Sequence, residues 1–441
     1  MGLPLLVLLC TAHFMDAIDL SDVTVALPAI QADLGLGAGA LGWVVAAYLL
    51  GYGGFLLLGG RVADVWGARR VLLVATAVFL AAGAVGTFAP DGATLIAARL
   101  VKGVAAAFLA PASLALISTR WPEGPARGKA LGAYATAGAA GFVGGLVLGG
   151  AVTEVSWRLA MALPLPFAVA VLLLAPRLIP RGGPVTREPL DLTGAVLATG
   201  GFSALVLALT TGPQLGWAGP VTLVTAVAAV LALVGFVLRE RHAPAPLLPL
   251  DYLAGRTAAG SALAIACLWA AYSGFAFLAT LAFQNVLGWS PLQAALAFAP
   301  IGLVNGVLAP QAGKLASRIG VRPMVVGGMV LLTLSYALFF RLEPGAGFVS
   351  VVLPVMAVNG VGIAATFAPL NMAALGAAPA GRQGLAASVL GAAQQIGGAV
   401  GLAAVTAGVH GAGLTGYTFA TALIVAVSAA GVLCALVLRT R

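Results

Sequence analysis

The chain contains 441 residues, of which 61% are hydrophobic and 8% are charged, and its mean hydropathy is +1.08. Soluble domains carry about a quarter of charged residues, so a soluble protein of this length is excluded. The formal net charge of +9 comes from short basic clusters between apolar runs, which indicates membrane orientation and not a nucleic-acid partner. The three cysteines also lie inside apolar runs, so neither a disulfide framework nor a metal site is expected.

Fourteen apolar runs are long enough to cross a bilayer, which takes about 20 residues. The first run has no Lys or Arg before it and continues past Cys10, so we interpret it as a membrane helix and not as a cleaved signal. The predicted spans cover residues 3–30, 41–59, 71–89, 94–117, 130–152, 157–176, 192–212, 219–238, 257–283, 292–312, 324–341, 347–375, 385–410 and 416–438. The sequence therefore predicts an all-α integral membrane protein with fourteen transmembrane helices.

The charged residues divide the linkers between these spans into two alternating classes. Most of the 22 Lys and Arg residues fall in every second linker or at the C-terminus, whereas the other linkers hold Asp33, Asp91, Glu154 and Glu343. Short loops that are rich in Lys and Arg stay in the cytoplasm. The alternation predicts an even number of spans, with both termini in the cytoplasm.

A short basic segment occurs twice, each time between two spans. Gly60–Arg70 (G-R-V-A-D-V-W-G-A-R-R) and Gly313–Pro323 (G-K-L-A-S-R-I-G-V-R-P) match at a constant offset. Internal repetition of this kind is typical of secondary transporters built from two related halves. We therefore predict an N-terminal six-helix bundle over residues 1–176, a linker with two extra helices over 177–256, and a C-terminal six-helix bundle over 257–441.

Three further patterns accompany this repeat. They are Ile18–Pro28 (I-D-L-S-D-V-T-V-A-L-P), Arg99–Gly103 (R-L-V-K-G) and the glycine pattern of Gly141–Gly150. Together with Gly60–Arg70 they resemble the major facilitator superfamily, and specifically its fourteen-helix drug:proton antiporters of the EmrB/QacA type. In that family the first-helix pattern is L-D-x-T-I-V-N-V-A-L-P and the fourth-helix pattern is R-x-x-Q-G. The family's acidic position therefore falls on Asp19, Lys102 replaces the usual Gln, and the resemblance implies drug export in exchange for protons.

Three acidic residues on the first predicted helix are the clearest sign of a functional site. Asp16, Asp19 and Asp22 recur every three residues, which places them on one face of the helix. A carboxylate in hydrocarbon costs at least ~2.5–3.5 kcal/mol, so all three must face the bundle interior or water. Arg99 and Lys102 of the fourth predicted helix fall at a matching depth, and we expect them to pair with two of the carboxylates.

Three acids against two bases leave one carboxyl without a cation. Desolvation and like-charge repulsion favour the neutral form of such a group, which suits a proton carrier. A proton and a cationic substrate would compete to neutralise it, and this competition is antiport. We assign proton coupling to these five residues, with Asp19 as the first candidate, and the alternative is a static ion-pair network. His13 either extends a relay towards the cytoplasm or is an ordinary interior histidine.

The resemblance also suggests where gating occurs. In the family the loop between helices 2 and 3 is thought to latch the cytoplasmic side in the outward-facing state. This role carries over to Gly60, Arg61, Asp64, Gly67, Arg69 and Arg70, although plain positive-inside anchoring would suffice for Arg70. On the fifth predicted helix, Gly141, Gly145 and Gly149 allow close packing of helices, so a gating role there competes with generic tight packing.

Aromatic and amide residues that would line the central cavity of this architecture are the predicted substrate contacts. Such residues suit a large amphipathic drug that could be cationic, although each could also be ordinary packing. They are Tyr48, Tyr52, Trp269, Tyr272, Phe275, Asn305, Asn359 and Gln394. The predicted helices of the second half hold no acidic residue, so selectivity for a cation would come from the first helix.

Other classes of protein fit the sequence less well. Gly124–Ala130 lacks the spacing and the Ser or Thr that an ATP-binding P-loop requires, and His13 beside three Asp is a weak basis for an intramembrane enzyme. A facilitative or proton-coupled importer of a small metabolite shares the fold but does not need the string of acids. A non-transporting receptor or scaffold would be expected to carry long soluble domains or tails. We therefore expect a proton-coupled exporter of drugs or antibiotics, a monomer among the lipids of a bacterial inner membrane, with no cofactor besides the coupling proton.

Overall fold

The protein is described by a computed structural model that covers residues 2–122, 125–180, 191–243, 250–377, 383–409 and 413–438. These residues form helices and short connections, and no strand occurs among them. The predicted all-α class is confirmed. The physical reason is that a backbone in lipid must satisfy its hydrogen bonds within its own segment, which a helix does.

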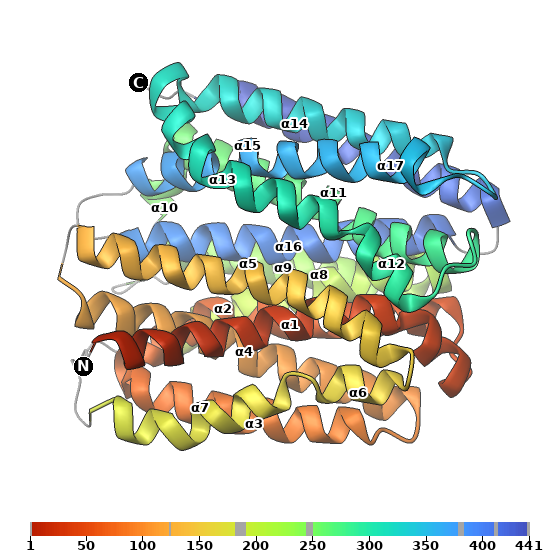
Figure 1. The fold of residues 1–441 in the computed structure, drawn as a ribbon. Coiled ribbons are helices and arrows are strands. Elements are labelled where there is room, and N and C mark those ends of the chain that lie inside the picture. Colours follow the sequence, from red (N-terminus) through yellow and green to blue (C-terminus); the bar gives the residue numbers. More distant parts are fainter. Residues whose placement is uncertain are drawn as a thin grey trace. The chain divides into compact units, whose positions relative to one another are not determined.

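The chain divides into two compact units, which are described separately (Figure 1). Unit 1 comprises Met1–Ser203 and Ala229–Leu247, and unit 2 comprises Ala204–Ala228 and Leu248–Arg441. The helices before the boundary are α1 (Gly2–Leu34), α2 (Ala38–Trp66), α3 (Ala68–Thr87), α4 (Gly92–Arg120), α5 (Pro125–Thr153), α6 (Trp157–Ala162) and α7 (Leu165–Leu178), followed by the pair α8 (Leu192–Leu215) and α9 (Pro220–Glu240). Unit 2 continues with α10 (Leu250–Ala254), α11 (Arg256–Asn285), α12 (Pro291–Ala297), α13 (Ala299–Ile319), α14 (Val321–Leu338), the 3-10 turn η1 (Phe339–Arg341), the π-helical turn η2 (Phe348–Val352), α15 (Leu353–Ala377), α16 (Gln383–Val409) and α17 (Gly413–Leu436).

Thirteen stretches of the described chain are long and apolar enough to cross a membrane. The remaining predicted span, 192–212, coincides with α8, in which Thr193–Leu209 forms a shorter apolar helix. The predicted spans are therefore found as helices, while the count of fourteen crossings stays a prediction. One span, Trp157–Leu178, is divided into α6 and α7 near Pro164.

The two units repeat the same helix pairs. In unit 1 the main contacts join α1 to α5 and α7, α2 to α4, and α3 to α4 and α7. In unit 2 the corresponding contacts join α11 to α16 and α17, α13 to α15, and α14 to α15 and α17. Each unit thus buries its apolar faces in the same pattern, as the sequence repeat leads one to expect.

The repeated basic segments are mostly helical, which corrects the prediction of a loop over residues 60–70. Helix α2 continues to Trp66 and α3 begins at Ala68, so Gly67 alone separates them. Gly67 has a φ of +89°, a backbone conformation that residues with a Cβ rarely adopt. Gly320 separates α13 from α14 in the same way, with a φ of +95°. The chain can therefore reverse its direction within one residue. Helix α2 continues up to this point because no residue before Gly67 breaks it.

A single carboxylate joins three helix ends in unit 1. Asp33, near the end of α1, accepts a hydrogen bond from Trp157 Nε1 at 2.8 Å and from Arg158 Nη1 at 2.6 Å. The second nitrogen of Arg158, Nη2, donates to the carbonyl of Ala89, just beyond α3, at 3.1 Å. These bonds fix the start of α6 against the ends of α1 and α3.

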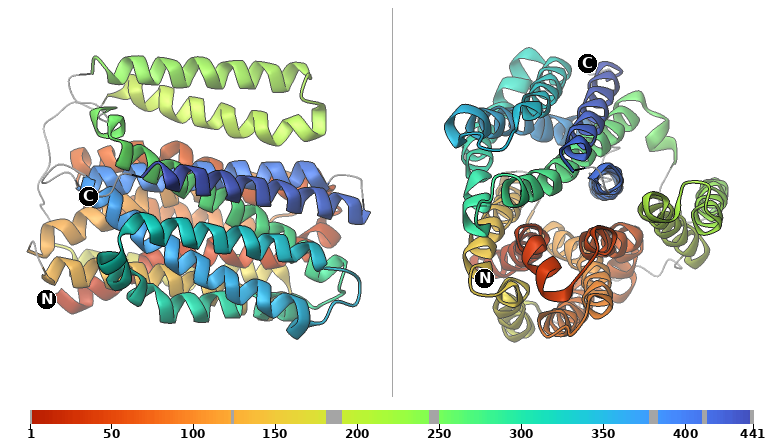
Figure 2. Two further views of the ribbon diagram at one scale, coloured as in Figure 1. Left: turned by 90° about the horizontal axis from the view of Figure 1, so that it is seen from above. Right: turned by 90° about the vertical axis from the view of Figure 1, so that its right-hand side faces the viewer.

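Helices α8 and α9 form an antiparallel pair (Figure 2). Asp191, just before α8, accepts the Nε of Arg239 from the end of α9 at 3.1 and 3.2 Å. Farther along, Gly201 lies against Leu233. The boundary between the units falls inside both helices. The sequence analysis instead places the pair in a separate linker between the two bundles, and these domain limits stay a prediction.

Candidate functional site

Three aspartates of α1 lie inside unit 1 and not on its lipid-facing surface. Asp19 and Asp22 are fully buried, and Asp16 is only 8% exposed. At a rise of about 1.5 Å per residue, their three-residue spacing distributes them over roughly 9 Å of helix. A charge in lipid is costly, so the sequence predicts that the three aspartates lie in the interior, and the structure places them there.

Both cationic side chains of α4 bind the same aspartate. Arg99 Nη1 donates to Asp19 Oδ2 at 2.7 Å and also to the backbone carbonyl of Asp19 at 3.2 Å. Lys102 Nζ donates to the other carboxylate oxygen, Oδ1. All three residues are at most 1% exposed. A buried arrangement of this kind is stable only because each charge has a partner in the low-dielectric interior.

This convergence corrects the expectation that two acids would each take one base. Arg99 and Lys102 stand one turn apart on the same face of α4, so both can reach a single carboxylate from opposite sides. Within the described part of the chain, Asp16 and Asp22 therefore make no ion pair. If all five side chains are charged, the cluster carries a net charge of −1.

Asp16 is bound by a phenol. The hydroxyl of Tyr48, on α2, donates to Asp16 Oδ1, and the face of the Tyr48 ring lies 4.4 Å from the Cζ atom of Arg99. Tyr52 stacks on Tyr48 with ring centroids 6.1 Å apart. Gly103 follows Lys102 in α4, and a Cβ there would lie 2.8 Å from the backbone carbon of Tyr48. The motif glycine therefore lets α4 approach α2 and brings the bases and Tyr48 together, a contact that the matched depths alone did not predict.

Asp22 has no such partner. Neither of its carboxylate oxygens accepts a hydrogen bond within the described part of the chain, although the residue is fully buried. It lies against Gly149 of α5, where a Cβ would come within 2.7 Å of the Asp22 Cβ. The family pattern has an apolar residue at this position, so Asp22 is a feature of this chain.

The predicted gating glycines of α5 face α1. A Cβ at Gly141 would meet the Phe14 backbone and the Ala17 side chain, and one at Gly145 would meet Ile18. Together with Gly149 at Asp22, they bring the two backbones into close contact along a face of α1 that adjoins the acids at Asp22. The contact lies within unit 1, and the gating role stays a prediction.

His13 lies one turn before Asp16 on α1. Its ring stacks on that of Tyr134, with centroids 4.2 Å apart and planes 5° from parallel. The Nδ1 atom is buried and has no hydrogen-bond partner in the described residues. His13 thus extends the polar face of α1 by one turn, which is where a relay would need it.

The segment around Gly67 holds helix ends together inside unit 1. Arg69 Nε donates to the carbonyl of Ile179 at 2.8 Å, and its Nη2 donates to that of Pro176 at 3.2 Å, so Arg69 caps α7. Gly60 has only the Pro111 side chain nearby, at 3.8 Å, and the close helix contact is made by Gly59, which faces Ala107.

The other predicted latch residues lie around these. Arg61 is half-buried on α2 and Arg70 is exposed in the first turn of α3. Asp64 belongs to the last turn of α2, not to a loop before α3, and its side chain lies outside the described residues. The latch itself stays a prediction.

Of the six predicted substrate residues outside unit 1, three are buried in the interior of unit 2, namely Tyr272, Phe275 and Asn359. Phe275 is 1% exposed and packs on Tyr336 and Phe339 at 5.0 and 5.2 Å between ring centroids. Asn359 is fully buried and donates to Ser335 Oγ at 3.5 Å. These two residues are core contacts in the structure.

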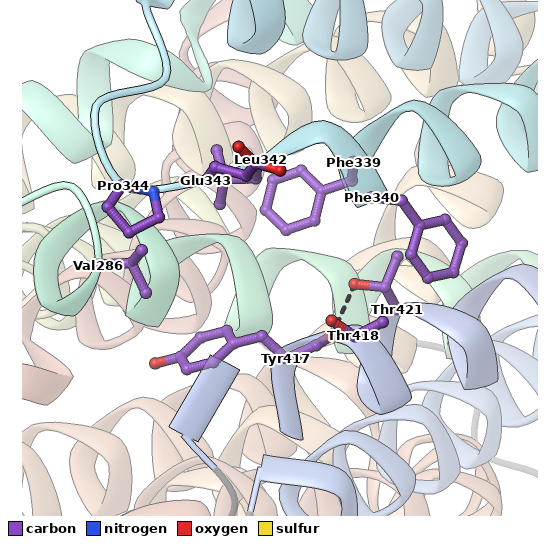
Figure 3. A pocket seen from close by; sticks show the side chains of 9 residues that line it. All are labelled: Val286, Phe339, Phe340, Leu342, Glu343, Pro344, Tyr417, Thr418 and Thr421. Carbon is purple, nitrogen blue, oxygen red and sulfur yellow. Dashed lines mark hydrogen bonds between the residues drawn. The ribbon is translucent and has the colours of Figure 1, made fainter. Parts of the chain in front are cut away.

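The remaining substrate candidates keep more exposure. Trp269 of α11 is half-buried and meets the ring of the buried Tyr272 edge to face at 5.6 Å between centroids, and Asn305 of α13 and Gln394 of α16 are also half-buried. A pocket of about 220 Å³ in unit 2 lies elsewhere, between the end of α11, the segment after α14 and the start of α17 (Figure 3). The residues that line this pocket include Glu343 and several aromatic side chains but none of the predicted substrate residues.

Comparison with known families decides what kind of protein carries this cluster. The model of the Major Facilitator Superfamily matches residues 9–402 and, in a second match, residues 261–441. The chain belongs to the major facilitator superfamily. This membership confirms the fold that the motifs imply, and it makes the chain a multi-pass membrane protein of a transporter family.

Individual relatives of this major facilitator are in accord with its place in the superfamily. The puromycin resistance protein of Streptomyces alboniger is 38% identical over 403 residues, which are 90% of this chain and 80% of the relative. The cephamycin export protein of Amycolatopsis lactamdurans is 37% identical over 417 residues, 93% of this chain and 85% of the relative. A crystal structure of a POT peptide transporter in complex with sulfate has a TM-score of 0.72 and 17% identity and covers 98% of this chain and 93% of its own. At that identity the structural likeness supports the fold alone.

Proposed function

We propose that this major facilitator exports amphipathic drugs or antibiotics across a bacterial inner membrane in exchange for protons. The observation that carries the proposal is the buried cluster of three acids and two bases between α1, α2 and α4. The antibiotic resistance and export functions named for its relatives support the direction of transport and the substrate class. Transport, and not catalysis, is the activity that this site suits.

The cluster can couple two ligands because its charge does not balance. Arg99 and Lys102 together neutralise Asp19 and leave one positive charge against the other two carboxyls. The charge of −1 that remains can be cancelled by a proton or by a cationic substrate, and in a low-dielectric interior both cannot be favoured at once. Competition for one negative charge links the release of one ligand to the binding of the other.

Alternating access requires that α1 can change its neighbours without unfolding. Glycines along α5 give α1 a smooth packing surface, and Gly67 and Gly320 give each unit a one-residue reversal between helices. Such close, small-residue contacts allow rigid helices to shift against one another. We propose that the exporter works as a monomer and that its substrates are amphipathic molecules, including cations.

The proposal is tested with the purified chain in liposomes that hold an imposed pH gradient. Ethidium and puromycin serve as probes, and a change in the gradient should drive their accumulation, which a protonophore should abolish. The Asp19→Asn chain is the comparison, because it removes the centre of the cluster. Accumulation that ignores the gradient in the unaltered chain would refute proton coupling and favour a facilitative carrier.

A further inference from the structure

The buried cluster contains three carboxyls that are not equivalent. Asp19 has both oxygens occupied by the cations Arg99 and Lys102, and Asp16 accepts the Tyr48 hydroxyl. Asp22 is as deeply buried as Asp19 but makes no hydrogen bond in the described part of the chain. The negative charge of Asp19 is therefore the best compensated of the three, because two cations donate to it.

We infer that Asp22 carries the proton that this transporter exchanges. The inference rests on the proposed function, which supplies the exchange of protons. It adds that Asp22 is the residue that carries the proton, a role that the family's motif does not assign. A carboxyl with no donor is satisfied by its own proton, whereas a carboxylate at the same place would remain buried and unpaired.

The groups around Asp22 fit this role. From its own helix Asp19 faces it as the nearest acid, and from α4 come Arg99 and Lys102, both already bound to Asp19. From α5 the contact is Gly149, which has no side chain to donate. The titratable groups of α2, Tyr48 and Tyr52, lie at Asp16, two turns nearer the start of α1.

Loss of the proton would also change the partners of Arg99. Its Nη2 atom is buried and makes no hydrogen bond to any described residue, although Nη1 and Nε are both occupied. When the O–H bond of Asp22 breaks, the electron pair stays on the carboxylate and the proton passes to water. The new negative charge then attracts either the substrate cation or the vacant donor of Arg99.

Infrared difference spectroscopy tests the assignment without a substrate. The unaltered chain at neutral pH should show the C=O stretch of a protonated carboxylic acid, and a rise in pH should remove it. Asp22→Asn should lose this band, Asp16→Asn should keep it, and Asp22→Glu should keep it with a shifted midpoint. A band that survives in Asp22→Asn and disappears in Asp16→Asn would overturn the assignment. If neither asparagine variant folds, Asp22→Glu decides, because a band whose frequency and midpoint are unchanged by this substitution overturns the assignment, as does the absence of any acid band in the unaltered chain at neutral pH.

Proton release on adding ethidium to the purified chain separates this inference from the proposed function. Release by the unaltered chain and by Asp91→Asn, an acid at the start of α4 outside the cluster, with complete loss in Asp22→Asn, supports both. Release that persists in Asp22→Asn overturns the role of Asp22 and leaves proton-coupled export intact. Binding of ethidium without release by the unaltered chain overturns coupled export, even where the infrared band shows that Asp22 holds a proton.

Discussion

Replacement of Gly149 by alanine tests whether the close approach of α5 to α1 holds the acidic face in place. The new methyl group would lie 2.7 Å from the Cβ and 2.8 Å from the Cα of Asp22. Carbon atoms in ordinary contact are about 3.5–4.0 Å apart, so one helix has to recede by about 1 Å. Overpacking of this kind typically costs ~1–3 kcal/mol.

Helix propensity acts in the opposite direction, because alanine stabilises a helix by about 1 kcal/mol relative to glycine. We therefore expect Gly149→Ala to lower the stability by up to ~2 kcal/mol. Gly144→Ala in the same helix is the matched control. Its methyl group would have the Phe14 ring as nearest neighbour, at an ordinary 3.8 Å, so it should gain the propensity term without a clash.

The assay is thermal unfolding of the purified chain in detergent, followed by the fluorescence of its tryptophans. Gly144→Ala should raise the midpoint slightly and Gly149→Ala should lower it. Gly149→Ala should also reduce proton-driven export of ethidium, because the displaced backbone belongs to Asp22. Equal midpoints for the two variants, or a higher one for Gly149→Ala, would refute the close packing of α5 on α1.

Three further substitutions test separate contacts. Gly67→Ala should lower the stability by ~1–2 kcal/mol, because alanine is strained at a φ of +89°. A methyl group at Gly327 would have no atom within 4 Å, so Gly327→Ala should be neutral or stabilising, and the unfolding midpoint distinguishes the two variants. Arg99→Met should cost roughly 3–5 kcal/mol by leaving Asp19 with a single cation, and Asp19→Asn in the same chain should recover part of this loss in the midpoint. Tyr48→Phe removes the donor to a buried carboxyl and should cost ~1–3 kcal/mol, with a shifted pH profile of export.

Controls keep these results specific. Tyr52→Phe removes a neighbouring hydroxyl that makes no hydrogen bond to an acid among the described residues, so a pH profile of export that shifts equally in both tyrosine variants would argue against the bond to Asp16. Additive losses for Arg99→Met and Asp19→Asn would mean that the two side chains do not interact. A midpoint for Gly67→Ala that matches Gly327→Ala would contradict the left-handed turn.

Much of the fold could be predicted because it depends on properties that are local in the sequence. The apolar runs give the helices, and the alternation of basic linkers orders them without any knowledge of packing. The loop over residues 60–70 was the exception, because nothing in Arg61–Trp66 forbids a helix and only the φ of Gly67 ends one. The apolar runs end at residue 59 and begin again at residue 71, so they predict a linker there, whereas Gly67 alone separates α2 from α3.

The candidate site was predictable in its members but not in its pairing. Depth along the helices placed Arg99 and Lys102 beside the aspartates, yet depth does not say which way a side chain faces. Their convergence on Asp19 depends on the rotation of α4, and this rotation is set by packing partners such as Gly103 against Tyr48. For the same reason Tyr48 was assigned to the substrate, while the structure places its hydroxyl on Asp16.

The charged chemistry of the membrane interior is unevenly shared between the halves of the chain. Residues 257–441 contain a single acidic residue, Glu343, which lies in the connection between η1 and η2, whereas the acids of α1 stand in the midst of the first half. Under the proposed function the exchanged proton is therefore handled by the first half alone, and a chimera of two such exporters should take its proton coupling from the parent that supplies this half.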